Sequence, residues 1–199
     1  KNKIEVDFKN KNLDSKNLLF LELNNLKNVD DYTKVRAKAD SRALKLKYSN
    51  KKIFQKNLPK GTTAKTLYNM TEQIRYEIIG SNNLKGIKKN ILKNYELKQK
   101  YKRQDQLKTK EDVKISEAFE LYLQKHFFEV NLTSLSKEIL SFWQETFDRK
   151  LKGKISFFKK NIHNQEIFNS FFSKAIESMN IDDDLNDDNL DENNKESKN

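Results

Sequence analysis

Hydrophobic residues recur at helical spacing along most of the chain and alternate with polar ones only near its start. Ile4, Val6 and Phe8 are separated by polar residues, and a second apolar run follows at residues 18–23. Alternation of this kind is typical of half-buried strands. We therefore predict a small β-hairpin over about residues 3–23, with the polar residues 9–17 as its loop.

From residue 30 onward the period becomes helical, and Asp30 is the expected N-cap of the first helix. Pro59 ends a short second helix, because proline disfavours helical geometry in the residue before it. Thr62 or Thr63 is expected to cap the third helix, and Gly80 to end it in a left-handed conformation. In the first helix the predicted core-facing stripe consists of Tyr32, Val35, Ala39, Ala43 and Leu46. The expected helices cover about residues 30–48, 51–57, 62–80, 83–99, 115–128, 135–151 and 156–179.

The last residues differ from the rest in composition. Residues 182–199 contain eight acidic residues and two lysines. Such a segment buries too little apolar area to offset the loss of chain entropy on folding. We therefore expect a mainly helical domain over residues 1–181, followed by a disordered acidic linker over residues 182–199.

The net charge of +11 conceals a more basic domain, because residues 182–199 carry −6 and leave +17 on residues 1–181. A basic helical nucleic-acid-binding module is therefore an alternative interpretation. However, 35 of the 40 basic residues are lysine, whereas recognition of phosphates and bases favours arginine. We accordingly prefer an interpretation without nucleic acid as a partner.

The chain contains no cysteine, which is typical of a reducing compartment. No apolar run approaches the roughly 20 residues that a bilayer span requires. We expect a cytoplasmic protein that is not anchored in a membrane.

Two segments place charged residues among apolar ones at helical spacing. Arg36 and Asp40 are four residues apart, and Glu72 and Arg75 are three apart, so each pair lies on one helix face. Together with Glu77 they predict a polar network between the first and third helices. Such a network either fixes helix packing or supports a surface that a partner reads, and both interpretations stay open here.

Within these segments stand the strings Ala39-Asp-Ser-x-Ala-Leu44, Glu72-Gln-x-Arg-x-Glu77-x-x-Gly80 and Gly86-x-x-x-Asn90. In these strings the chain resembles the N-terminal region of the T subunit of the aerobic, ATP-dependent cobaltochelatase, the CobT family. A weaker likeness continues through Trp143-x-x-x-x-Asp148-x-Lys150. The positions selected as family-motif, structural or interface residues are Arg36, Asp40, Ser41, Glu72, Gln73, Arg75, Glu77 and Gly80.

The resemblance implies a three-component machine that inserts cobalt into the corrin ring of hydrogenobyrinic acid a,c-diamide during cobalamin synthesis. A large subunit binds the corrin, an AAA+ subunit hydrolyses ATP, and the T subunit works beside the AAA+ ring. By this resemblance the chain is a non-catalytic assembly segment, and ATP, Mg²⁺ and cobalt are used by the complex rather than bound here. Magnesium chelatases use related machinery, so the metal stays open. The family's von Willebrand A-type domain carries an Asp-x-Ser-x-Ser motif, which does not occur in this sequence.

The residues themselves lead us to expect no catalytic, cofactor-binding or metal site. There is no Gly-x-x-x-x-Gly-Lys-Ser/Thr loop for phosphate, no Gly-x-Ser-x-Gly elbow and no cysteine nucleophile. His126 and His163 are far apart, and neither has another histidine or a cysteine at metal-ligand spacing.

Overall fold

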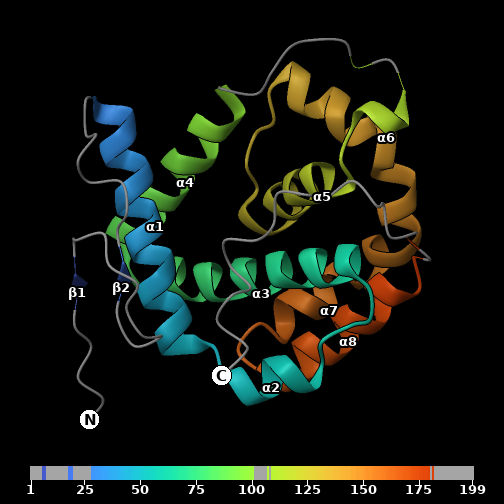
Figure 1. Cartoon of the computed structure of the whole chain (residues 1–199), viewed down its shortest axis with the longest axis horizontal. Coiled ribbons are helices and arrows are strands. Elements are labelled where there is room, and N and C mark those ends of the chain that lie inside the picture. The colour runs from blue at the N-terminus through green and yellow to red at the C-terminus, as the bar shows by residue number, and fades with distance from the viewer. Residues whose placement is uncertain are drawn as a thin grey trace.

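The computed structural model describes residues 6–7, 18–19, 28–100, 107, 109–179 and 181, and most of these are helical (Figure 1). The longer helices are α1 (Val29–Tyr48), α3 (Thr62–Asn83), α4 (Lys85–Lys100), α5 (Ile115–Leu123), α6 (Ser134–Leu151) and α8 (Gln165–Glu177). The shorter ones are α2 (Lys51–Lys56), η2 (Lys110–Asp112), η3 (Gln124–Phe128), η4 (Lys152–Lys154) and α7 (Ile155–Lys160). The prediction of a mainly helical fold is confirmed.

The predicted N-terminal β-hairpin is wrong. The described residues in this region form only two strands of two residues each, β1 (Val6–Asp7) and β2 (Leu18–Leu19), and these pair in parallel. A hairpin requires antiparallel strands. Alternation over three apolar residues is a weak signal, because it suits any short extended segment and does not specify strand direction. The rest of the predicted hairpin, and the acidic linker at residues 182–199, lie outside the described residues.

Helix α3 forms the centre of the molecule. It packs against α1, α4, α5 and α8, and Figure 1 shows it crossing the middle of the structure with α1 on one side and α8 on another. Its buried residues therefore occupy more than one face, and they include the charged residues Glu72, Arg75 and Glu77. Because α3 has neighbours on several sides, its polar residues must find partners inside the protein.

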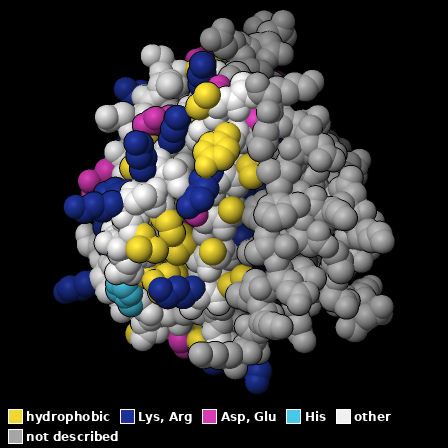
Figure 2. Space-filling model, turned by 90° about the vertical axis from the view of Figure 1, so that its left-hand side faces the viewer, with side chains coloured by type: hydrophobic (Ala, Val, Ile, Leu, Met, Phe, Trp, Pro, Cys, Tyr) yellow, Lys and Arg dark blue, Asp and Glu magenta, His cyan; other side chains and the backbone are white. Residues whose placement is uncertain are grey.

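The face of α1 that packs against the core is not the apolar stripe that was predicted. Its buried residues are Thr33, Ala37, Asp40 and Leu44, while Tyr32 and Leu46 of the predicted stripe are 59% and 54% exposed. Figure 2 looks at the side of the molecule on which α1 lies and shows hydrophobic side chains exposed among lysine and arginine. The buried face is rich in small and polar residues, which allow close approach and hydrogen bonding to α3 and α4.

Gly80 has a different role from the predicted one. Helix α3 continues through it to Asn83, so Gly80 is not a left-handed cap. A Cβ atom at this position would lie 2.2 Å from Leu44 Cδ2 of α1. Gly80 therefore permits the close contact between α1 and α3, because no other residue leaves room for the Leu44 side chain.

Several helix ends also differ from the prediction. Asn28 rather than Asp30 caps α1, since its Oδ1 accepts a hydrogen bond from the Asp31 backbone N–H at 2.9 Å. Helix α3 begins at Thr62 directly after Gly61, whose φ of 87° suits glycine. Neither Thr62 nor Thr63 is therefore the N-cap.

The long last helix predicted over residues 156–179 is divided into α7 and α8. Asn161 ends α7 by donating from Nδ2 to the Phe157 carbonyl at 2.9 Å. Asn164 begins α8 by accepting from the Ile167 N–H at 3.1 Å. Asparagine competes with helical hydrogen bonding in this way, and two asparagines three residues apart therefore make a turn.

The core of the C-terminal half is aromatic. The rings of Phe158 and Phe172 stack at 3.9 Å between centroids, and Phe168 lies 5.0 Å from Phe172. All three side chains are fully buried. These three rings hold α7 and α8 together. Helix α8 also packs against α3, and the start of α8 therefore lies beside Arg75.

Candidate functional site

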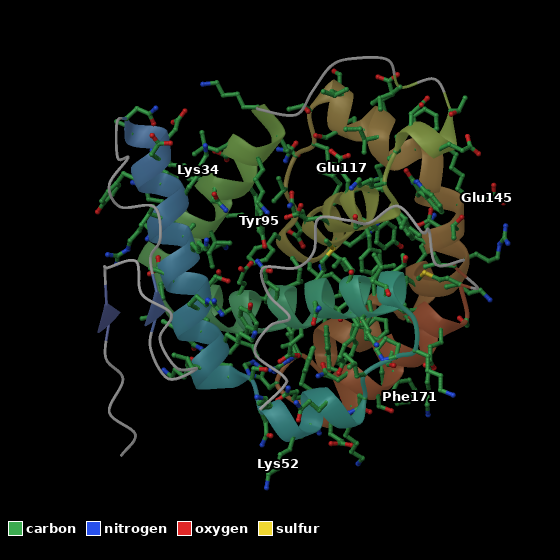
Figure 3. All side chains as sticks on the ribbon, in the orientation of Figure 1. Lys34, Lys52, Tyr95, Glu117, Glu145 and Phe171 are labelled. Carbon is green, nitrogen blue, oxygen red and sulfur yellow. The ribbon has the colours of Figure 1, made fainter. Side chains whose placement is uncertain are left out.

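The carboxyl group of Glu77 joins three helices. Its Oε1 accepts hydrogen bonds from Ser41 Oγ on α1 at 2.6 Å and from Gln73 Nε2 on α3 at 2.9 Å. Its Oε2 accepts a short hydrogen bond from the Tyr95 hydroxyl on α4. Figure 3 labels Tyr95 where α4 approaches α1 and α3. We call Ser41, Gln73, Glu77 and Tyr95 the Glu77 cluster.

All three hydrogen-bond donors to Glu77 are uncharged groups, and Glu77 as a residue is only 3% exposed. Burial raises the pKa of Glu77, although the hydrogen bonds and the charge of Lys98 act in the opposite direction. Burial and the neighbouring Glu77 carboxyl likewise raise the pKa of Tyr95. The cluster therefore favours a protonated, neutral carboxyl more than water does.

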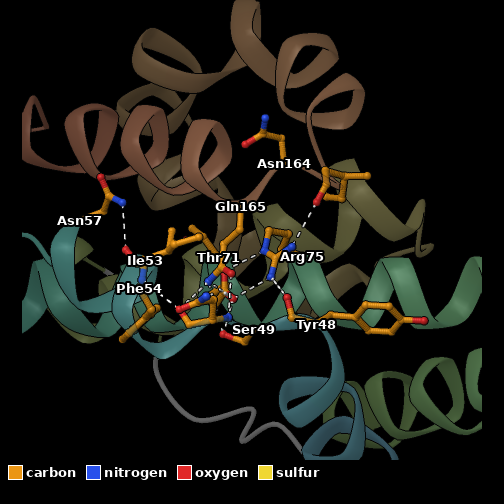
Figure 4. A network of polar contacts seen from close by, with 12 residues as sticks. Tyr48, Ser49, Ile53, Phe54, Asn57, Thr71, Arg75, Asn164 and Gln165 are labelled. Carbon is orange, nitrogen blue, oxygen red and sulfur yellow. Dashed lines mark hydrogen bonds and ion pairs between the residues drawn. The ribbon is translucent and has the colours of Figure 1, made fainter.

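A second group of buried polar side chains surrounds Arg75. Its guanidinium donates to Glu72 through Nε at 2.8 Å and through Nη2 at 2.9 Å, which is the bidentate geometry of strong arginine–carboxylate pairs. The side chains of both residues are almost fully buried. Glu72 Oε1 also accepts from Ser49 Oγ at 2.6 Å and from Gln165 Nε2 at 3.0 Å. We call Ser49, Glu72, Arg75 and Gln165 the Arg75 cluster (Figure 4).

The Arg75 cluster binds backbone groups at the ends of other elements. Arg75 Nη2 donates to the carbonyl of Tyr48, the last residue of α1, and Nη1 donates to the Ile162 carbonyl at 3.3 Å. Gln165, at the start of α8, accepts from the Asn50 N–H at 2.7 Å. Terminal carbonyls of a helix lack intrahelical partners. The cluster satisfies one of them and so fixes where α1 ends relative to α3 and α8.

Arg36 and Asp40 form a third, more exposed group. Arg36 Nε lies 3.5 Å from Asp40 Oδ1, and the Arg36 side chain is 55% exposed. Asp40 Oδ2 accepts a hydrogen bond from Asn90 Nδ2 at 2.6 Å, which links α1 to α4.

The selected residues thus all lie in or beside contacts of α1 with α3 and α4, but in three groups rather than one network. Glu72 pairs with Arg75, Ser41 and Gln73 with Glu77, and Arg36 with Asp40. Among the described residues, no hydrogen bond or ion pair connects Arg36 or Asp40 with Glu72 or Arg75. Gly80 lies one turn after Glu77 and lets α1 approach, as described above.

Sequence reasoning missed four of the partners. Tyr95, Ser49 and Gln165 were not selected, although each donates a hydrogen bond to a buried carboxyl group. Asn90 stood in one of the family-like strings and was not chosen as a site residue. A polar residue directly after the predicted end of a helix, as Ser49 is, was the one available signal.

The polar side chains of these three groups are not arranged as a catalytic or ligand-binding site. The buried carboxyl and guanidinium groups already have protein partners, so they are suited to fixing helix positions. Within the described ranges, no group of three or more His, Cys, Asp or Glu residues is placed to hold a metal ion. His126 is half-buried, its ring lies 4.3 Å from that of Tyr122, and burial lowers its pKa; His163 is exposed in the turn before α8.

None of the described helices combines the length and the apolar character that a bilayer span requires. The family model for cobalamin biosynthesis protein CobT matches residues 1–199, which is the whole chain. No solved structure matches the chain.

Proposed function

The chain belongs to the CobT family of cobalamin biosynthesis proteins, and from this premise we propose that it is a non-catalytic subunit of an ATP-dependent cobaltochelatase. Its partners in this proposal are an AAA+ subunit, which hydrolyses ATP with Mg²⁺, and a large subunit, which binds the corrin. Cobalt and hydrogenobyrinic acid a,c-diamide are the substrates of the complex. The reaction is that of a cytoplasmic biosynthetic enzyme.

The observation that carries the proposal is the match of the family model along the entire chain. The three groups of polar residues add physical support. They hold α1, α3, α4 and α8 in fixed positions through contacts that are mostly buried, as a rigid binding platform requires. A subunit that relays motion between two partners needs such rigidity more than it needs an acid, a base or a nucleophile.

Reconstitution of the complex tests the proposal. The full chain, the AAA+ subunit and the large subunit are mixed with cobalt and the corrin, and insertion is followed by the change in corrin absorbance. We expect insertion only when all three proteins and ATP are present, and we expect the chain to co-elute with the AAA+ subunit. Failure of the chain to bind either partner with or without ATP would contradict the proposal.

Replacing cobalt and the corrin with magnesium and a porphyrin in the same assay tests metal specificity. We expect activity with cobalt and not with magnesium. The reverse result would assign the chain to a related magnesium-inserting complex.

The charge of +17 on residues 1–181 supports one alternative, a basic module that binds nucleic acid. Affinity for a labelled DNA or RNA duplex, measured by anisotropy, then falls by about 10³–10⁵ between about 50 mM and 200 mM salt if 6–10 phosphates are contacted. Docking on a protein partner is expected to be much less sensitive to salt. The same titration with the AAA+ subunit therefore separates the two functions.

A further inference from the structure

An exposed aromatic pair on α7 and α8 lies outside the polar groups described above. Phe157 and Phe171 are 38% and 47% exposed, and their ring centroids are 4.8 Å apart. Figure 3 places Phe171 at the rim of the molecule beside α8. Covering two adjacent rings removes a large apolar area from water, so the pair is a favourable place for another apolar segment to bind.

Lysines surround this pair. Lys154 and Lys160 are three residues before and after Phe157 on the same helical stretch, so they flank its ring. Lys174 Nζ lies 5.9 Å from the Phe171 ring centroid. We call these two phenylalanines and three lysines the aromatic–lysine patch.

The lysines of the patch differ from the lysines next to them. Lys152 is paired with Asp148 at 3.9 Å, and Lys159 with Glu129 at 3.2 Å. By contrast, no carboxylate in the described part of the chain forms an ion pair with Lys154, Lys160 or Lys174. The patch therefore presents apolar rings within uncompensated positive charge, which is complementary to a segment that is both acidic and apolar.

The chain itself carries such a segment close to the patch. Residues 182–192 contain seven acidic residues together with Leu185 and Leu190, and α8 ends at Glu177. Leu185 stands eight residues beyond that end, so an extended chain places it up to about 26–29 Å away. Phe171 lies only six helical residues before the end of α8, which is about 9 Å. The segment is therefore long enough to fold back onto the patch.

We propose that residues 182–192 bind the aromatic–lysine patch of the same chain. In this arrangement the leucines cover the rings of Phe157 and Phe171, and the carboxylates pair with the three lysines. Because the segment is covalently attached, its effective concentration is in about the millimolar range, so a weak contact is sufficient. While it is bound, this segment covers the aromatic–lysine patch. An acidic, apolar segment of a partner protein then has to displace it in order to bind there. This proposal does not depend on the proposed function.

Carbodiimide crosslinking tests the contact in the full chain, because this reagent couples a carboxylate directly to a nearby lysine. At low protein concentration we expect crosslinks from residues 182–192 to Lys154, Lys160 and Lys174, mapped by mass spectrometry. Leu185→Ser/Leu190→Ser leaves the helices and all charges unchanged and is expected to reduce these crosslinks about tenfold, equivalent to about 1.4 kcal/mol. Phe157→Ser/Phe171→Ser is expected to do the same, with its melting temperature as a check on folding.

The exposed Lys88, Lys89 and Lys93 on α4 provide the internal control. Equal crosslinking to these lysines, or yields that do not change in the leucine variant, would show long-range charge attraction alone and overturn the proposal. A mixture of ¹⁴N- and ¹⁵N-labelled chains identifies crosslinks between molecules. If these dominate, a second copy of the chain occupies the patch and the intramolecular proposal is wrong.

Discussion

The Arg75 cluster and the Glu77 cluster fasten α1 to α3 by different chemistry. In the first, the carboxylate of Glu72 meets a guanidinium, whereas in the second the carboxyl of Glu77 meets only hydroxyl and amide groups. Arginine remains charged at any pH relevant to proteins, so the Arg75 cluster balances its charge internally. The Glu77 cluster buries an acid that has no cation among its hydrogen-bond donors, and the charge of Lys98 offsets the effect of burial only in part. The charge of the nearest donor, and not burial alone, therefore decides how a buried acid responds to mutation and to pH.

The largest effect is expected from Arg75→Ala, which removes the cation and leaves Glu72 buried without it. Breaking a buried ion pair in this way costs about 3–5 kcal/mol, a large part of the roughly 5–15 kcal/mol by which proteins are stable. Unfolding by denaturant, monitored by circular dichroism, measures the loss in the free energy of unfolding. Because the Arg75 cluster also sets the end of α1, we expect binding to the AAA+ subunit to weaken in the same variant.

Arg149→Ala is the matched control for Arg75→Ala, since Arg149 pairs with Glu145 on the surface at a similar distance of 2.9 Å. Exposed pairs of this kind contribute about 0–1 kcal/mol. If Arg75→Ala is no more destabilising than Arg149→Ala, the Arg75 cluster does not stabilise the contacts between the helices. The two clusters then do not differ in the way described above.

Gly80→Ala tests whether the Glu77 cluster depends on the close approach of α1. The added Cβ would lie 2.2 Å from Leu44 Cδ2, and overpacking of a core costs about 1–3 kcal/mol. This loss is expected although alanine is the better helix former by about 1 kcal/mol.

Leu44→Ala/Gly80→Ala supplies the check on that explanation. Removing the Leu44 side chain makes room for the new methyl group, so the two substitutions together should cost less than the sum of their separate effects. Strict additivity in denaturant unfolding would mean that the loss in Gly80→Ala does not arise from contact with Leu44.

Gly80 and helix α1 show which features of helix packing the sequence could predict. The sequence shows a glycine at position 80, and a glycine suits both a left-handed helix end and a close helix crossing. Similarly, spacing shows that Arg36 and Asp40 share one face and that Glu72 and Arg75 share another. It does not show how far each helix is rotated against its neighbour. For this reason the pairs were predictable, while their separation into different groups was not.

The helices themselves were predictable where the apolar spacing is regular, as in α6, which was expected over residues 135–151 and covers Ser134–Leu151. The break between α7 and α8 was missed, because aromatic residues continue on both sides of Asn161 and Asn164 and conceal the turn. Tyr95 and Gln165 were missed as cluster members because spacing within one helix does not show which side chains of other helices it meets. Whether the selected residues contribute to docking on a partner stays a prediction.

Glu77→Gln tests the pH response that distinguishes the two clusters. Burial raises the pKa of Glu77 in the folded protein, so the folded chain binds this proton more tightly than the unfolded chain. The resulting stabilisation is complete below the unfolded pKa of about 4.3 and is lost as the pH rises through the higher folded pKa. Near about pH 4 the parent and the variant should differ by no more than about 1 kcal/mol, since rotating hydroxyls adapt to the amide.

As the pH rises from there, the parent should lose stability relative to Glu77→Gln. Denaturant unfolding of both proteins across the pH range provides the measurement. Parallel stability curves would mean that folding does not change the pKa of Glu77, and a parent that gains stability relative to the variant would mean that the pKa is lowered as in a salt-bridged acid. Either result would remove the distinction between the clusters.

The smallest effect is expected from Arg36→Ala, because Arg36 is the exposed cation among the three groups. Arg36 contacts Asp40 at 3.5 Å but is mostly in water, and Asp40 retains its hydrogen bond from Asn90 when the arginine is removed. We expect a loss below about 1 kcal/mol that shrinks further at high salt, because exposed charges are screened. A loss as large as that of Arg75→Ala, unchanged by salt, would mean that Asp40 depends on its exposed cation as much as Glu72 depends on its buried one. The charge of the partner, and not the exposure of that partner, would then decide how much an ion pair contributes to stability.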